Sequence, residues 1–205
     1  MSAFTSIFSL RGLAAASALL GLLALGACAG GPPPSTQVKQ VSFTAKPPLK
    51  LDVAQISIQN SYAPPSSTDH LENSHSVTPV SVAEGWGNAR LVAVGRQGTA
   101  TLTIEEGSVV SEPLKTKTGL AGLVSDEPDT KLTGTLRARL TVLQPGMITG
   151  YSANVVAKAT RTVLQSASLN DRDAAYSALI QALAAQFDTS FETQIRASMG
   201  QIIVR

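Results

Sequence analysis

The sequence holds few of the residues that metal binding and catalysis most often need. Its 205 residues include two histidines and one cysteine. His70 and His75 lie near Asp69 and Glu72, and imidazole and carboxylate groups together are candidate metal ligands. However, their spacing matches no tight zinc pattern, and a loop rich in serine and proline does not preorganise ligands. We therefore predict no metal site and no cofactor.

The sequence shows few features of a site for acid–base or nucleophilic catalysis. Glu105 and Glu106 are neighbours on a predicted strand, where adjacent side chains point to opposite faces, and Asp126, Glu127 and Asp129 form a loop cluster. The chain has no Gly-x-Ser-x-Gly motif, no phosphate-binding Gly-x-x-x-x-Gly-Lys loop and no dinucleotide fingerprint. We expect a protein that is not an enzyme, with serine or carboxylate sites left open.

The single cysteine lies in the most specific motif of the chain. An apolar stretch over residues 12–24 is typical of a secretory signal, and Leu25, Gly26 and Ala27 then precede Cys28. These four residues match the bacterial lipobox. The resemblance implies that the Cys28 thiol receives a diacylglyceryl group, that the chain is cut before it, and that the new amine is acylated, for example with palmitate. An ordinary signal peptide or an uncleaved anchor is the alternative.

The motif and the prolines predict three parts of the chain. Residues 1–27 are the lipoprotein signal peptide, 28–49 the acylated cysteine with a proline-rich extended linker, and 50–205 a single folded domain. Ala29 follows Cys28, in place of the aspartate that resembles an inner-membrane retention signal. We therefore expect a lipid anchor in the outer membrane, with the domain on the periplasmic side, and the inner membrane as the alternative.

Composition and charge exclude other classes of protein. Hydrophobic residues make up 43% of the chain and charged residues 15%, which is too apolar for an intrinsically disordered chain. No second long apolar run follows the leader, so a multi-span membrane protein is excluded. Sixteen basic residues against 14 acidic ones give no bulk attraction to nucleic acid.

Apolar periodicity predicts an α+β domain. The expected elements, in chain order, are a strand over 50–60 with a bulge near 54–55, a loop over 61–77, a helix from Thr78 towards a cap at Gly95, a strand over 100–110 with a bulge near Gly107, strands over 132–142 and 151–160, and a helix over 171–199. The strands alternate and bury one face. We predict a two-layer βαβββα sandwich with a mostly antiparallel four-stranded sheet and both helices on one face. The first two strands are parallel if adjacent, and the last two form a hairpin.

Two expectations concern the helices. Trp86 is expected to be the core anchor of the first helix, since large aromatic side chains dominate core burial. The second helix would run about 43 Å from Asp171 to Met199, longer than a typical strand. An end that overhangs the sheet would expose Phe191, Ile195 and Met199 to a partner helix.

One candidate contact surface is apolar. The loop over 112–130 contains Leu120, Leu123 and Val124 in a glycine-bearing connection longer than most hairpins use. Such side chains need an apolar partner, which is either the core of this domain or another protein, a lipid or the bilayer surface.

A second candidate contact surface is basic. In the last two predicted strands, every second side chain is expected to face solvent. These solvent-facing positions hold Arg137, Arg139 and Lys158. They could contact the phosphates of lipid headgroups. The alternative is a solvated sheet face that protects against aggregation.

A family resemblance rests on the organisation of the chain. The features that carry it are the lipobox, the proline-rich tether, Trp86 with Arg90-Leu91, the Thr118-Gly119-Leu120 loop and the amphipathic run to Met199. Over about residues 50–200 this organisation resembles small outer-membrane lipoproteins of intermembrane lipid transport, namely the auxiliary lipoprotein of ABC-type systems and the lipopolysaccharide-assembly lipoprotein.

The resemblance implies a noncatalytic accessory subunit of an envelope lipid transport or outer-membrane assembly complex. The alternatives are a carrier that binds lipid or lipopolysaccharide, and a structural lipoprotein of the cell envelope. The expected partners are the membrane, through acylated Cys28, an envelope protein complex and lipid, with no nucleic acid.

Overall fold

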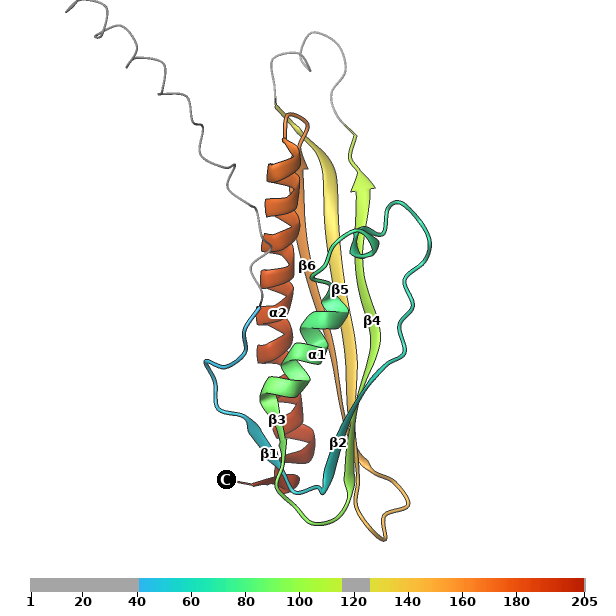
Figure 1. The fold of residues 1–205 in the computed structure, drawn as a ribbon, viewed down its shortest axis with the longest axis vertical. Coiled ribbons are helices and arrows are strands. Elements are labelled where there is room, and N and C mark those ends of the chain that lie inside the picture. Colours follow the sequence, from blue (N-terminus) through green and yellow to red (C-terminus); the bar gives the residue numbers. More distant parts are fainter. Residues whose placement is uncertain (1–40, 116–125, 205) are drawn as a thin grey trace, which may run out of the picture. The chain divides into compact units, whose positions relative to one another are not determined.

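The computed structural model describes residues 41–115 and 126–204 (Figure 1). Its elements are β1 (Leu49–Leu51), β2 (Gln55–Asn60), the 3-10 turn η1 (Leu71–Asn73), α1 (Pro79–Arg90), β3 (Leu91–Ala93), β4 (Thr99–Pro113), β5 (Pro128–Leu143), β6 (Tyr151–Leu164), α2 (Leu169–Met199), η2 (Gly200–Ile202) and β7 (Ile203–Val204). The predicted α+β class is confirmed.

The larger sheet has four strands in the order β2-β4-β5-β6. β2 runs parallel to β4, while β4–β5 and β5–β6 are antiparallel, so the predicted parallel pair and the predicted hairpin are confirmed. On one face Leu102, Leu136 and Leu140 are fully buried. Both helices pack on the sheet: α2 lies along β6 and β5, and α1 along β4 and β5 (Figure 1). Because every second residue of these strands is apolar, one face of the sheet is apolar, and the helices cover that face.

The predicted first strand is in fact two strands in two sheets. β1 pairs with β3 and β7 in a small three-stranded sheet, whereas β2 joins the larger sheet. The chain turns between them, where the amide of Val53 donates to the carbonyl of Leu51 at 2.8 Å. The change of apolar parity near residue 54 marks this change of sheet, so the predicted bulge is wrong.

The start of α1 is as predicted but its end is not. Thr78 and Ser81 form a capping box and Pro79 opens the first turn. The helix ends at Arg90, because the next three residues form β3 beside β1. Gly95 is therefore no helix cap. It lies where the backbone turns against β1, and a Cβ there would be 2.6 Å from the amide nitrogen of Val53.

The expected overhang of the last helix is wrong. α2 has 31 residues and begins at a capping box of Ser168 and Asp171. Phe191, Ile195 and Met199 are fully buried. The strands are longer than average, with 14 to 16 residues in β4, β5 and β6, so at about 3.3 Å per residue they match a helix of about 46 Å.

No helix within residues 41–115 and 126–204 is long and apolar enough to cross a membrane.

The segment over 61–77 is a loop, as predicted, and it covers the edge of β4 beyond the end of β2. Glu72 is 6% exposed. One of its carboxylate oxygens accepts from the amide of Val109 at 2.9 Å, and the other bonds with Tyr62 and His70 at 2.7 and 2.8 Å. The carboxylate of Glu72 thus accepts a hydrogen bond from the Val109 amide of β4, which no neighbouring strand reaches.

This arrangement makes Glu72 a source of pH-dependent stability. Burial alone would raise the pKa of Glu72, but its hydrogen bonds with His70, Tyr62 and Val109 hold that pKa below its ordinary value of 4.5. A carboxyl group with a lowered folded pKa stabilises the fold above its unfolded pKa, and this contribution is lost as the pH falls through the folded pKa.

We predict that Glu72→Gln lowers the free energy of unfolding at pH 7 by about 1–3 kcal/mol, since it weakens hydrogen bonds to buried groups. We expect the stability of the native chain to decline below pH 4.5, and the variant should lose part of that decline. Urea unfolding between pH 7 and pH 3 measures both effects. Glu84→Gln on α1 is the matched control, and equal pH profiles for the native chain and Glu72→Gln would contradict the assignment.

Candidate functional site: a groove beside the entry of the chain

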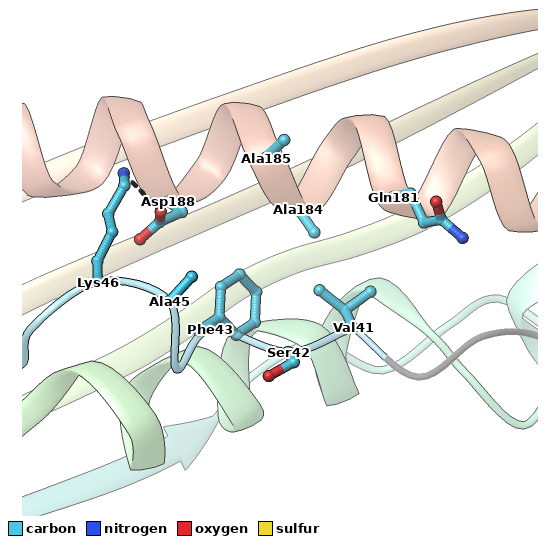
Figure 2. Close-up of a pocket in the computed structure, with 9 residues that line it drawn as sticks. All are labelled: Val41, Ser42, Phe43, Ala45, Lys46, Gln181, Ala184, Ala185 and Asp188. Atoms are coloured by element: carbon cyan, nitrogen blue, oxygen red, sulfur yellow. Dashed lines mark ion pairs between the residues drawn. The ribbon is translucent and has the colours of Figure 1, made fainter.

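The described chain enters the domain through residues 41–48, here called the strap, which packs against α2. Phe43 is 8% exposed and belongs to the hydrophobic core. The strap and the helix leave a groove of about 450 Å³ between them (Figure 2). Its lining residues are Val41, Ser42, Phe43, Ala45, Lys46, Gln181, Ala184, Ala185 and Asp188.

The groove exists because the helix presents small side chains to the strap. Ala184 is buried beneath it and Ala185 is exposed beside it, while Phe43 forms the opposite wall. In Figure 2 Gln181 and Asp188 mark its two ends along α2. The lining is mostly apolar, and its charged groups, Lys46 and Asp188, lie at one end.

That charged end belongs to a network of ion pairs that joins the strap to both helices. Arg90 of α1 is fully buried and donates to Asp188 at 3.1 Å, to Glu192 and to the carbonyl of Pro47. Lys46 lies 2.7 Å from Asp188 and 3.6 Å from Glu192.

Two further side chains complete the network. The indole N–H of Trp86 donates to Asp188 at 2.8 Å, and Arg196 donates to Glu192 at 2.8 and 2.9 Å. Trp86 is fully buried and stacks on Phe191 with ring centroids 4.8 Å apart, so its predicted role as the core anchor of α1 is confirmed.

The network keeps its members charged. Burial alone would raise the pKa values of Asp188 and Glu192, but bonds from Lys46 and Trp86 to the first, and from Arg196 to the second, hold both pKa values below their ordinary range, with Arg90 adding to each effect. The hydrogen bond with Asp188 raises the pKa of Lys46. Each carboxylate is therefore a paired anion at neutral pH, suited to fixing the strap rather than to taking a proton from a substrate.

The predicted basic surface is present on the sheet face opposite the helices, and its arginines have partners. Arg137 lies 3.3 Å from Glu106 and Arg139 lies 3.1 Å from Glu105. The expectation that these two glutamates point to opposite faces is wrong, because a register shift between Ile104 and Glu106 brings both to the arginines.

Lys158 lies on β6, opposite Thr135 in the register. Its side chain is exposed, and its backbone amide donates to Gln186 of α2 at 3.3 Å. Arg137, Arg139 and Lys158 thus occupy neighbouring strands, as the sequence predicts, well separated along the chain from the strap.

The two histidines form hydrogen bonds within the loop over 61–77. His70 bonds to Glu72, as described above, and His75 bonds to the carbonyl of Leu71 at 2.8 Å. The ring of His75 also stacks on Tyr176 with centroids 3.7 Å apart. In residues 41–115 and 126–204 no three potential ligands gather to hold a metal ion.

The remaining predicted residues lie outside the described ranges. They are the signal residues Leu25, Gly26 and Ala27, the lipidation residue Cys28, and the apolar loop residues Leu120, Leu123 and Val124.

Sequence reasoning missed the charged network. A signal existed: Trp86 and Arg90 are four residues apart on α1, and Asp188 and Glu192 are four apart on α2, each next to a core phenylalanine. Charges at helical spacing along the border of an apolar stripe indicate ion pairs between helices. Lys46 gave no such signal, because it lies in a proline-rich segment without periodicity.

Comparisons with known proteins find weak structural similarity only. No protein-family model matches the chain, and no curated protein sequence matches it. A minor lipoprotein from Acinetobacter baumannii is 16% identical, over 70% of this chain and 93% of its own, with a TM-score of 0.36. Protein XCC0632 from Xanthomonas campestris, of the family DUF330, is 11% identical over 77% and 94%, with a TM-score of 0.31.

A PelC dodecamer from Paraburkholderia phytofirmans is 13% identical over 70% of this chain and 92% of its own, with a TM-score of 0.23. The chain therefore resembles a bacterial lipoprotein at a low level of structural similarity. At these identities and TM-scores the likeness assigns no family and carries no functional argument.

Proposed function

We propose that the protein is a lipid-anchored, noncatalytic accessory subunit of an envelope complex for lipid transport or outer-membrane assembly. The observation that carries the proposal is the lipobox at Leu25–Cys28, followed by a proline-rich tether. Two or three acyl chains on Cys28 give a stable anchor, since each buried methylene contributes about 0.8 kcal/mol. The proposed location is the outer membrane, with the domain in the periplasm.

The strap supports this role because it fixes the point at which the tether meets the domain. Arg90 binds the backbone of Pro47, and Lys46 binds Asp188. A chain fixed in this way holds the domain in a defined orientation relative to the first strap residue. A defined orientation favours docking on a partner that is itself fixed in the envelope.

The face of the four-stranded sheet opposite α1 and α2 is the proposed docking surface. In register, Ser57, Thr101, Thr141 and Ser152 form a row of hydroxyl groups across the four strands. Arg137 and Arg139 lie on the same sheet with exposed side chains and paired glutamates. A polar surface of this composition suits a reversible protein interface more than an obligate one, which would be more hydrophobic.

We predict that Cys28→Ala releases the protein from membranes. The variant carries a cleavable secretory signal without a lipobox in place of residues 1–27, so that no apolar leader is retained. Loss of the thiol then removes the proposed acyl chains, and the polar tether gives no hydrophobic anchorage. The measurement is fractionation of cells into membrane and soluble periplasmic fractions, with mass spectrometry of the mature N-terminus. The native chain should be membrane-bound with an acylated N-terminal cysteine. Unmodified Cys28 in the native chain, or membrane retention of Cys28→Ala, would contradict the proposal.

A further inference from the structure

We infer that the groove between the strap and α2 binds one acyl chain of an anionic lipid, with the lipid headgroup beside Lys46. This inference deepens the proposed function and rests on its membrane anchorage, because it names the ligand class that an anchored subunit would take from the bilayer.

The walls of the groove suit an acyl chain. Val41, Phe43 and Ala45 line one side and the two alanines of α2 line the other. The volume of about 450 Å³ lies in the range of small-molecule sites. From Gln181 to Asp188 the groove follows about 10 Å of the helix, so it encloses a section of a chain rather than a whole lipid.

The distribution of polar groups also favours an acyl chain over a peptide. A bound peptide would bring backbone donors and acceptors that need partners along its length, and burying them unpaired is costly. In the groove the polar side chains are Ser42, Gln181, Lys46 and Asp188, and the last two lie together at one end. A lipid has the same distribution, with an apolar chain and charge at one end.

The charge at that end favours an anion. The network described above contains three cations, Lys46, Arg90 and Arg196, against the two carboxylates Asp188 and Glu192. One positive charge is therefore in surplus. Lys46 is the cation that reaches the groove, and its side chain is 44% exposed, whereas Arg90 is fully buried. The phosphodiester of a lipid whose headgroup carries no cation of its own, such as phosphatidylglycerol, would supply the missing negative charge.

Photocrosslinking tests the inference with the full lipidated chain. The protein is reconstituted into phosphatidylcholine vesicles that carry a small fraction of phosphatidylglycerol with a diazirine in one acyl chain. Flotation of the vesicles first establishes anchorage, so failure of the proposed anchor is seen separately. After illumination, mass spectrometry of peptides locates the crosslinks. The variants are Ala185→Phe, which adds a large side chain at an exposed residue that lines the groove, and Ala197→Phe, an exposed alanine elsewhere on α2.

We expect crosslinks concentrated on residues 41–46 and 181–188 in the native chain and in Ala197→Phe. Ala185→Phe should reduce them about tenfold, equivalent to about 1.4 kcal/mol of binding free energy. The same diazirine on phosphatidylcholine should crosslink severalfold less to the native chain, because its headgroup has no net negative charge. An unchanged yield of crosslinks in Ala185→Phe, or crosslinks spread evenly over the domain, would overturn the inference. Equal labelling by the two lipids would overturn it as well. The inference would also be overturned if protein that floats with the vesicles gave no crosslinks in the groove. That result is expected if another part of the chain fills the groove.

Discussion

Replacement of Arg90 by methionine is expected to lower the free energy of unfolding by about 3–5 kcal/mol. The guanidinium group is fully buried and bonds to Asp188, Glu192 and the carbonyl of Pro47. Methionine fills similar space but leaves two carboxylates with fewer partners in a partly buried site. The penalty comes from those uncompensated charges more than from the loss of attraction itself.

Equilibrium urea unfolding measures the effect of Arg90→Met. Arg196→Met is the matched control, because Arg196 also pairs with Glu192 but its side chain is 51% exposed. An exposed pair contributes about 0–1 kcal/mol, so the control should stay near the native value. Equal losses in the two variants would contradict the account of a buried network that fastens the strap.

Phe191→Ala is expected to cost about 3–5 kcal/mol of unfolding free energy, since it leaves a cavity in the core. The side chain is fully buried between Trp86 and Phe187, with ring centroids at 4.8 and 5.3 Å. The substitution also removes one wall that positions Trp86, the donor to Asp188.

Thermal or urea unfolding checks this value, with Leu169→Ala as the control on the same helix. Leu169 is 81% exposed, so its replacement should change stability by less than about 0.5 kcal/mol. A loss of that small size for Phe191→Ala would mean that the end of α2 is exposed, as an overhanging helix would be, and would contradict the packing described here.

The elements that could be predicted from the sequence are those with long periodic patterns. The strands β4, β5 and β6 alternate over many residues, and α2 repeats apolar residues every four, so class, pairing and the buried helix face followed from periodicity. The start of each helix followed from Thr78 and Ser168, because a cap is a local signal.

The second sheet could not be predicted, because β1, β3 and β7 have only two or three residues each and no period. The paired use of Glu105 and Glu106 depended on the exact place of a bulge, which the sequence predicts near Gly107 and the structure has between Ile104 and Glu106. The groove depended on the strap, whose contacts with α2 join residues more than a hundred positions apart. Such contacts follow from tertiary packing and leave no local pattern.

The most direct test of the accessory-subunit proposal is affinity purification of the full lipoprotein from detergent-solubilised envelopes, beside Cys28→Ala, with mass spectrometry of proteins and lipids. We expect reproducible enrichment of a membrane transporter subunit or an outer-membrane barrel with the native chain, and loss of that enrichment with Cys28→Ala. Enrichment of lipid with no such protein would contradict the subunit role and favour a carrier, and equal recovery of the same partner with Cys28→Ala would contradict the need for the lipid anchor.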